Sequence, residues 1–416
     1  MQGKVEFVAV WQIKKQPLVL AVVVTLFLAI SPQAHAVVVT FPCGASGETY
    51  SVTMPEGILT DAKECSGSVV IDTSVKIIGA AAFQDDNFIN SVTIPDSVTE
   101  IGDSAFAGAA LTAVTMGKSV KTIQNRAFLN TQITAIVIPA SVTSIGDEAF
   151  SGNIITALII PNSVTSIGTA AFSFTQITTV NIPKSITSIS DEAFANTELI
   201  SVTIPDSVTS IGDKAFYNSQ LTSVKIPDSV VSIGNYAFNL TSLTSVILGN
   251  KLKTIGNGAF WDTELTSLTV PNSVVSIGDD AFSNTQLTSA IIGDGVKTIG
   301  DRAFKGDTIL AKISLPDELQ TVGENVFADN TVLARIEYCG KLTSFPIAAI
   351  CPPERLAAIA AKEKAASDKA AADLLAKQKP ATTAPVTKIT ITCIKGKVNK
   401  KVTALKPTCP KGYKKR

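Results

Sequence analysis

Apolar and polar residues alternate in one short pattern that returns along two-thirds of the chain. In the segment 221–242, LTSVKIPDSVVSIGNYAFNLTS, Val224 and Ile226 alternate with polar neighbours, as in a strand with one buried face. Pro227 ends this strand because it has no amide proton to donate to a ladder. A second short extended segment runs to Ile233, and a glycine then turns the chain. The pattern predicts two short parallel strands and one tight turn per repeat.

Phenylalanine marks the period of the pattern. Twelve phenylalanines recur at intervals of 22 residues, except that the first and last intervals are 23: Phe83, Phe106, Phe128, Phe150, Phe172, Phe194, Phe216, Phe238, Phe260, Phe282, Phe304 and Phe327. A fixed period of about 20–30 residues is the signature of a solenoid, in which each repeat packs against its neighbours. We therefore expect a β-rich solenoid of leucine-rich type, with about twelve repeats, an internal column of phenylalanine rings, and short helical or 3₁₀ turns that carry the Ala-Phe pairs.

A row of short polar side chains follows the turn position of the repeats: Asp103, Asn125, Asp147, Thr169, Asp191, Asp213, Asn235, Asn257, Asp279 and Asp301. Such side chains accept hydrogen bonds from free N–H groups at the start of a helical turn, so we predict N-caps. A row of carboxylates is also a possible Ca²⁺ site, but Asn and Thr interrupt it. Because capping explains the row without a metal, we predict no metal and no cofactor.

Charge is unevenly distributed along a chain of zero net charge. Residues 37–351 carry 16 Lys and Arg against 30 Asp and Glu, whereas residues 352–416 carry 16 against 4. At the N-terminus, Lys14 and Lys15 precede the apolar run 18–30, and Ala34-His35-Ala36 fits the cleavage pattern of export signals. We predict a signal peptide over 1–36, a secreted or cell-surface location and no transmembrane span after cleavage. An uncleaved anchor is the alternative.

The six cysteines form three local pairs: Cys43 with Cys65, Cys339 with Cys351, and Cys393 with Cys409. An even count in an exported chain favours disulfides, and although six cysteines allow fifteen connectivities, proximity favours these three pairs. We expect disulfide-locked caps over 37–68 and 339–351, on either side of a solenoid over 69–338.

The unit L-x-x-V-x-I-P-x-S-V-x-x-I-G-x-x-A-F resembles the BspA-like, or Treponema pallidum-type, class of leucine-rich repeats over about residues 69–338. One departure is that this class usually has cysteine three residues after the phenylalanine. This chain has a hydroxyl residue there: Thr131, Thr175, Thr197, Ser219, Thr241, Thr263 and Thr285. Members of the class are mostly surface or secreted proteins, and several act as adhesins. The resemblance therefore implies binding of an extracellular protein or glycan, without naming a ligand.

Catalysis has little support in the sequence. The single histidine, His35, lies in the predicted signal peptide, which leaves the mature chain without Ser-His or Cys-His nucleophiles or histidine metal ligands. Adjacent acids such as Asp147 and Glu148 are expected on solvated turns. A glycosidase uses a pair of carboxylates, but capping and solubility explain these acids better. We predict that the protein is not an enzyme.

Candidate binding residues fall in two groups. Outward strand positions are mostly small and uncharged, and they lack the Trp, Tyr and Arg that dominate binding hot spots. Exposed apolar residues at these positions fit either a contact patch or ordinary strand propensity. Aromatic residues gather instead around the Ala-Phe turns. The candidates are Val137, Ile159 and Lys225 on the strands and Phe174, Tyr217, Tyr236 and Trp261 at the turns.

The C-terminal residues indicate a separate basic module. Residues 352–387 read as an Ala- and Lys-rich helical spacer and linker. Residues 388–416 hold ten Lys and Arg and no acid, and they resemble the short basic two-Cys tails of exported actinobacterial proteins. We expect a hairpin that Cys393 and Cys409 staple and that binds an anionic cell-envelope polymer. A neutral tail and nucleic-acid binding are the alternatives, and we predict no nucleic acid. The candidate residues are Lys395, Lys397, Lys400, Lys401, Lys414 and Lys415.

Together these patterns predict a secreted or cell-surface solenoid that binds a macromolecule in adhesion or another surface interaction. The alternative is a structural, self-associating wall or matrix protein without a specific ligand.

Overall fold

The structure is a computed structural model that describes residues 37–44, 47–340, 349–377, 388–404 and 406–416. It divides into two compact units, Met1–Pro352 and Pro353–Arg416, which are described separately. The predicted signal peptide over 1–36 and residues 378–387 of the predicted linker lie outside the described residues.

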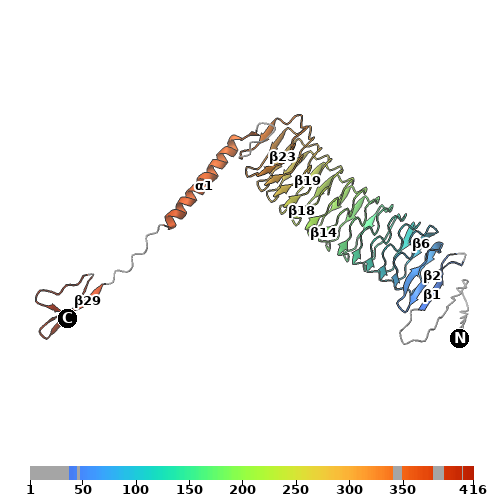
Figure 1. Cartoon of the computed structure of the whole chain (residues 1–416), viewed down its shortest axis with the longest axis horizontal. Helices are drawn as coiled ribbons and strands as arrows, with labels where there is room; N and C mark the ends of the chain where they lie inside the picture. The colour runs from blue at the N-terminus through green and yellow to red at the C-terminus, as the bar shows by residue number, and fades with distance from the viewer. Residues whose placement is uncertain (1–36, 45–46, 341–348, 378–387, 405) are drawn as a thin grey trace. The chain divides into compact units, whose positions relative to one another are not determined.

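The first unit is a β-solenoid of about 13 turns (Figure 1). Most repeats contribute a strand of two to five residues at the position of Val224, and the outward residues at this position form what we call the front face. These strands are β4 (Gly67–Val70), β6 (Ile89–Thr93), β8 (Ala113–Thr115), β11 (Leu158–Ile159), β13 (Thr179–Asn181), β15 (Ser201–Thr203), β17 (Ser223–Lys225), β19 (Ser245–Ile247), β21 (Ser267–Val270), β23 (Ser289–Ile292), β25 (Lys312–Ser314), β27 (Arg335–Glu337) and β28 (Ala349–Ile350). The repeat that contains Val137 has no strand there, although the sequence pattern predicted one.

A second row of two-residue strands follows the proline loops of the repeats. It comprises β5 (Ile77–Ile78), β7 (Glu100–Ile101), β9 (Thr122–Ile123), β10 (Ser144–Ile145), β12 (Ser166–Ile167), β14 (Ser188–Ile189), β16 (Ser210–Ile211), β18 (Ser232–Ile233), β20 (Thr254–Ile255), β22 (Ser276–Ile277), β24 (Thr298–Ile299) and β26 (Thr321–Val322). Strands pair in parallel with equivalent residues of the next repeat, as Val180 does with Val202. The register therefore advances by one whole repeat at each step.

The core is the predicted column of phenylalanine rings. Eleven of the twelve, from Phe83 to Phe304, are at most 1% exposed. Successive ring centroids are 4.8 to 6.0 Å apart, with interplanar angles of 1° to 19°. Because each internal repeat buries its ring between two others, the core is continuous along the axis.

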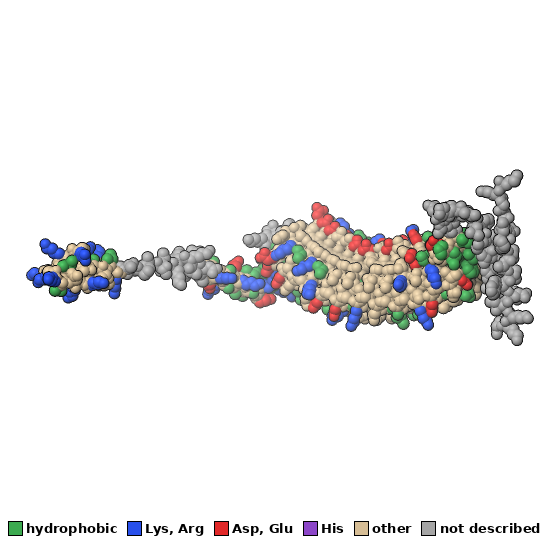
Figure 2. Space-filling model, turned by 90° about the horizontal axis from the view of Figure 1, so that it is seen from below, with side chains coloured by type: hydrophobic (Ala, Val, Ile, Leu, Met, Phe, Trp, Pro, Cys, Tyr) green, Lys and Arg blue, Asp and Glu red, His purple; other side chains and the backbone are tan. Residues whose placement is uncertain are grey.

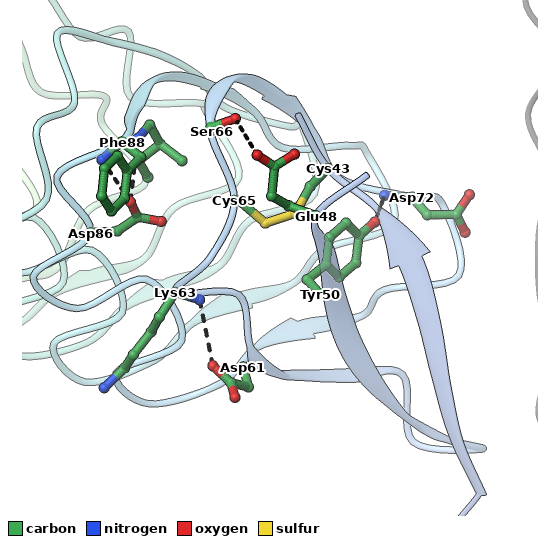
Figure 3. Close-up of a disulfide and its surroundings, with 11 residues drawn as sticks. Cys43, Glu48, Tyr50, Asp61, Lys63, Cys65, Ser66, Asp72, Asp86 and Phe88 are labelled. Atoms are coloured by element: carbon green, nitrogen blue, oxygen red, sulfur yellow. Dashed lines mark hydrogen bonds between the residues drawn. A yellow bond between two sulfur atoms is a disulfide. The ribbon is translucent and has the colours of Figure 1, made fainter. Parts of the chain in front are cut away.

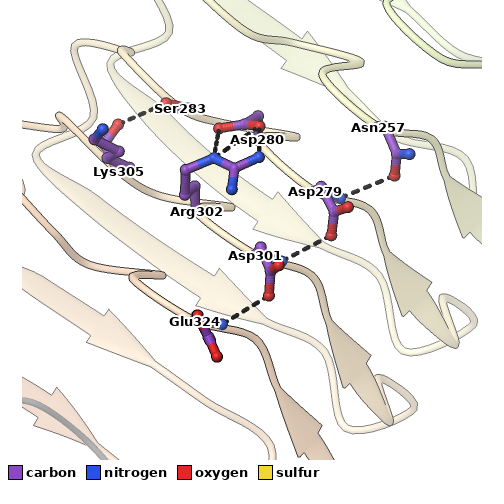
Figure 4. A network of polar contacts seen from close by, with 8 residues as sticks. All are labelled: Asn257, Asp279, Asp280, Ser283, Asp301, Arg302, Lys305 and Glu324. Atoms are coloured by element: carbon purple, nitrogen blue, oxygen red, sulfur yellow. Dashed lines mark hydrogen bonds and ion pairs between the residues drawn. The ribbon is translucent and has the colours of Figure 1, made fainter.

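Hydrogen bonds across repeats replace the predicted N-caps. From Asn125 onward, the Oδ1 atom of each Asp or Asn in the row accepts from the backbone N–H of the equivalent residue in the next repeat, for example Asp213 N to Asp191 Oδ1 at 2.7 Å. Figure 4 shows this Asp/Asn ladder from Asn257 to Glu324. The N-cap prediction was wrong because the next residue has a positive φ, as in Lys214 at 52°, which turns the chain instead of starting a helix. A bond from Tyr217 N to Lys214 O closes that turn.

An antiparallel cap precedes the repeats. It is formed by β1 (Val37–Pro42), β2 (Thr49–Met54) and β3 (Ile58–Asp61), and β3 then pairs in parallel with β5. The disulfide between Cys43 and Cys65 closes the cap (Figure 3). Beside it the Tyr50 hydroxyl oxygen accepts from the Asp72 N–H at 2.7 Å, and burial raises the pKa of Tyr50 to about 12. At the other end of the solenoid, Cys339 pairs with Cys351 as predicted.

The second unit contains a helix and a small sheet. Helix α1 (Pro353–Lys377) begins at a proline, whose missing N–H would have no partner in a first helical turn. The sheet has the order β30-β29-β31, from β29 (Ile389–Lys395), β30 (Val398–Ala404) and β31 (Lys414–Lys415). The predicted disulfide joins Cys393 to Cys409. No helix within the described ranges is both long and apolar enough to span a membrane.

Candidate functional site

The candidate binding residues lie on two different surfaces. Val137 and Ile159 point outward from adjacent repeats of the front face and are 82% and 80% exposed. Lys225 lies on the same face, three repeats after Ile159. The four aromatic candidates instead lie on the Ala-Phe turns, which we call the turn face. The structure thus separates the predicted residues into two surfaces.

On the turn face, two aromatic candidates contact one another. The rings of Tyr236 and Trp261 have centroids 6.3 Å apart and are tilted by 57°. A Cβ atom on Gly258 would lie 2.5 Å from Tyr236 Cδ1, so this glycine lets the Tyr236 ring lie against the backbone. Phe174 is 62% exposed but lies four repeats before Trp261. The turn face therefore offers one aromatic pair and no continuous aromatic platform.

One hollow of the solenoid lies on the front face. This front groove has a volume of about 1030 Å³ and crosses the repeats of β13, β15 and β17. Its lining comprises Asn162, Asn181, Ile182, Pro183, Lys184, Val202, Thr203, Ile204, Pro205, Asp206, Ser207, Lys225 and Pro227. A shallower flank groove of about 730 Å³ is lined by Thr156, Gln176, Thr178, Glu198, Ile200, Gln220, Thr222 and Ser242.

Sequence reasoning identified only Lys225 among the lining residues of the front groove. The signal that could have located the rest is Lys184, which follows Pro183 where nearby repeats have Asn162, Asp206 and Asp228, although Lys118 occupies the same position in an earlier repeat. Such a charge reversal within a repeat is visible in the sequence. That it faces a groove depends on how the repeats stack.

Backbone pairing between repeats lapses around the front groove. Strands β15 and β17 belong to different sheets, and so do β12 and β14. The ring centroids of Phe172, Phe194 and Phe216 are 5.8 Å apart at both steps, compared with 4.8 Å for Phe83 and Phe106. The repeats around the front groove are thus more widely spaced than those at the N-terminal end.

Ser190 explains one of these gaps. Neighbouring repeats have glycine at this position, and the Gly212 N–H donates to the Ile189 carbonyl at 2.8 Å. In the Ser190 repeat the side-chain Oγ, rather than the backbone N–H, donates to Ile167 O at 2.5 Å. The strand pairing between β12 and β14 is lost where the hydroxyl takes this carbonyl.

Charge in the front groove is mostly positive. Lys184 and Lys225 are exposed, and neither belongs to any ion pair found among the described residues. Asp206 supplies the one carboxylate of the lining, and Asn and Thr side chains supply neutral hydrogen-bonding groups. This arrangement can bind an anionic, hydroxyl-rich ligand.

Two buried carboxyl groups with raised pKa values lie outside both grooves. Asp307 Oδ1 accepts from the Thr285 N–H at 2.7 Å and from its hydroxyl at 2.8 Å, and burial raises the pKa of Asp307 to about 7. Burial also raises the pKa of Asp86. Each lies three residues after a phenylalanine, at the start of an interval of 23 residues. Within the described part of the chain, no group of three or more His, Cys, Asp or Glu is arranged to hold a metal.

The basic module divides its candidate lysines between two sides of a sheet. Lys401 pairs with Thr392 and Lys414 with Ile394, whereas Lys400 and Lys415 both pair with Cys393. Paired residues share a face, so Lys401 and Lys414 lie on the side opposite the disulfide. Lys395 and Lys397 flank the hairpin turn, and all six candidates are exposed. In Figure 2 Lys and Arg side chains are spread around this module, with hydrophobic and other side chains between them.

One family model matches most of the solenoid, and several solved structures are similar to the chain. The family model of the BspA type leucine rich repeat region matches residues 63–177, 165–288 and 253–359. A leucine-rich repeat protein from Bacteroides ovatus is 26% identical, with a TM-score of 0.49 over 72% of this chain and 92% of that one. A leucine rich cell surface protein from Faecalibacterium prausnitzii is 26% identical, with a TM-score of 0.41 over 75% of this chain and 97% of that one. The leucine-rich repeat protein of T. pallidum is 25% identical, with a TM-score of 0.36 over 39% of this chain and 82% of that one. No curated protein matches the chain.

Proposed function

Because the chain belongs to the BspA-type leucine-rich repeat family, as its repeat unit predicts, we propose that it is a secreted or cell-surface protein whose solenoid binds a macromolecule. The observation that carries the proposal is the front groove, an open hollow that crosses successive repeats and has unpaired lysines. An open groove of this kind accepts an extended protein or glycan better than a small enclosed substrate. Adhesion or another surface interaction is the role that fits.

Three disulfides support the extracellular location. All six cysteines are paired, and disulfides persist in oxidising compartments such as the cell exterior. The predicted signal peptide points to the same compartment.

A binding role is also favoured over a catalytic one. The family is generally non-enzymatic. The buried carboxyl groups of Asp86 and Asp307 pack inside the turns, and neither lines a groove. Their raised pKa values follow from burial in the stack, which gives them a structural explanation.

The basic module supplies retention at the cell envelope in this proposal. Ten Lys and Arg without an acid attract anionic wall polymers or head groups through long-range electrostatics. The exposed lysines on both sides of the sheet offer many weak contacts instead of one pocket. Such a module would retain the chain at an anionic surface.

One observation favours the structural alternative. Strand β1 lies at the edge of its sheet, contains no charged residue, and includes Val38 at 52% exposure. Uncharged edge strands pair readily with a second copy. Self-association through β1 would make the protein a matrix component.

Binding of the full-length chain to an array of extracellular matrix proteins and polysaccharides tests the proposal. A matched variant replaces the six candidate tail lysines by glutamine. Array binding that survives in this variant supports the solenoid as the binding unit. Concentration-dependent assembly in sedimentation, with no array binding, supports the structural alternative and contradicts the proposal.

A further inference from the structure

We propose that the front groove binds the carboxylate-bearing sugars of an acidic polysaccharide, an inference that rests on the proposed binding function. It names both the site and the chemical class of the ligand. Three features of the groove carry it: two unpaired lysines, a lapse in strand pairing, and a lining of amide and hydroxyl groups.

The two lysines are departures from their rows. Lys184 occupies the position after the proline where nearby repeats have Asn162, Asp206 and Asp228. Lys225 occupies the outward strand position where the preceding repeat has Thr203. Both are exposed and belong to no ion pair among the described residues. An ammonium group that serves no partner in the protein is available to a carboxylate, and charge-assisted hydrogen bonds are the stronger kind.

Strand pairing lapses around the same repeats, since β15 and β17 belong to different sheets and so do β12 and β14. In some proline loops an Asp or Asn side chain accepts from the next repeat, as in Asn250 N to Asp228 Oδ1 at 2.8 Å and Asp294 N to Asn272 Oδ1 at 2.9 Å. A lysine at position 184 cannot accept such a bond. The groove thus lies where the repeats leave polar groups for a ligand.

The rest of the lining selects sugar over protein. Asn162, Asn181 and Thr203 offer amide and hydroxyl groups that pair with sugar hydroxyls, and Asp206 accepts from a sugar hydroxyl. The lining contains no Trp, Tyr or Arg, the residues that anchor protein partners. Lys184 and Lys225 lie two repeats apart, on either side of the Thr203 repeat, so a polymer along the axis can meet both.

The test measures affinity for polygalacturonate, a polymer of uronic acid, by surface-immobilised binding. The parent is the full-length chain with glutamine at tail positions 395, 397, 400, 401, 414 and 415, so that the basic module does not capture the polymer. Lys184→Asn and Lys225→Thr introduce residues that other repeats have at those positions, which preserves the stack. We expect each substitution to weaken binding about tenfold, and the double variant further.

Three controls decide the outcome. Lys253→Thr removes an exposed lysine outside the groove at a position where other repeats have threonine, and it should leave binding unchanged. The methyl-esterified polymer has the same backbone without charge and should bind weakly. Polyglutamate presents the same carboxylates on a peptide and should bind at least tenfold more weakly than polygalacturonate.

Equal binding by the double variant and its parent would overturn the site. If the esterified polymer binds as tightly as polygalacturonate, charge has no role in recognition. If polyglutamate binds as tightly as polygalacturonate, the assignment of the ligand as a sugar is wrong. If the parent ignores polygalacturonate but binds another macromolecule, this inference fails while the proposed function stands. If it binds no macromolecule at all, both fail.

Discussion

Three residues after several of the phenylalanines, a buried threonine hydroxyl donates to the backbone of its own turn. The Thr175 hydroxyl donates to Phe172 O at 2.8 Å, and the Thr241 hydroxyl donates to Phe238 O at 2.7 Å. At the position where related repeats have cysteine, these threonine hydroxyls therefore stabilise the turn by a hydrogen bond. Asp86 and Asp307 occupy the same position where the interval is 23, and they accept from N–H groups instead. An extra residue thus comes with a buried acid.

Asp307→Asn should make the solenoid more stable at neutral and alkaline pH. The folded-state pKa of about 7 lies above the ordinary value of 3.8, so between these pH values the folded protein binds the extra proton. The contribution of Asp307 to stability is therefore greatest at acid pH and is lost as pH rises to about 7. At pH 8 asparagine should recover up to about 4 kcal/mol of the free energy of unfolding.

Denaturant unfolding of both proteins between pH 4 and pH 8 measures this effect. The difference between variant and wild type should grow with pH and then level off. Asp329→Asn, at a carboxylate whose contact with Lys305 is exposed, should change stability little. A difference that does not depend on pH would contradict the buried-acid explanation.

At the scale of elements, the period of the sequence predicted the stack, whereas its interruptions were not predictable. Phe83 to Phe327 predicted the ring column because one ring per repeat must occupy the same internal place. The Asp/Asn row was visible, but its partners were misassigned because a bond to the next repeat and a bond within the turn use the same side chains. The gap beside Ser190 depends on a close approach between neighbouring turns, which has no signature in one sequence.

Ser190→Gly should rejoin the second row of strands. Glycine would let its own N–H donate to Ile167 O, as the Gly168 N–H does to Ile145 O at 2.9 Å. One added backbone bond should stabilise this part of the solenoid by about 1 kcal/mol. Hydrogen exchange of the amides at 187–190 should slow correspondingly.

Gly212→Ser is the matched reverse change. A Cβ atom there would lie 2.4 Å from Asp191 Oδ1 and 2.7 Å from Asp191 N, so the turns must move apart. This variant should lose stability and exchange faster. Faster exchange in Ser190→Gly would show that the serine hydroxyl joins the repeats better than the backbone does.

The N-terminal cap should depend on its disulfide. Replacing Cys43 and Cys65 together by alanine opens a cross-link between residues 22 apart and should cost about 3 kcal/mol. Thermal unfolding and proteolysis of residues 37–100 measure the loss. The corresponding double replacement of Cys393 and Cys409 should leave solenoid melting unchanged, because that disulfide belongs to the other unit. A fall in solenoid melting from the second pair would contradict this independence.

At the scale of the whole molecule, charge divides between the two units. The solenoid and its caps carry an excess of acid and the C-terminal residues an excess of base, so we expect the two units to attract partners of opposite charge. This division and the disulfide pairs were evident from the sequence. The front groove was not, because it arises from the spacing of repeats whose sequences are almost alike.

Retention through the basic module should be sensitive to salt. Binding of the full-length chain to a purified cell-wall fraction should weaken steeply as NaCl rises from about 0.1 M to 1 M, where the Debye length falls from about 10 Å to 3 Å. The variant with six tail lysines replaced by glutamine should bind weakly at either concentration. Salt-resistant wall binding in that variant would assign retention to the solenoid.

The Asp/Asn ladder also bears on how such a protein changes over generations. Each rung joins a residue to its copy one period later, so duplication or loss of a complete 22-residue unit leaves every remaining rung with a partner. Insertion of a single residue would shift the rungs out of register unless a loop accommodates the extra residue, as it does before Phe106 and Phe327. Natural variants of this gene should therefore differ in length by whole coils, each adding one ring to the column and one step of about 5 Å to its reach.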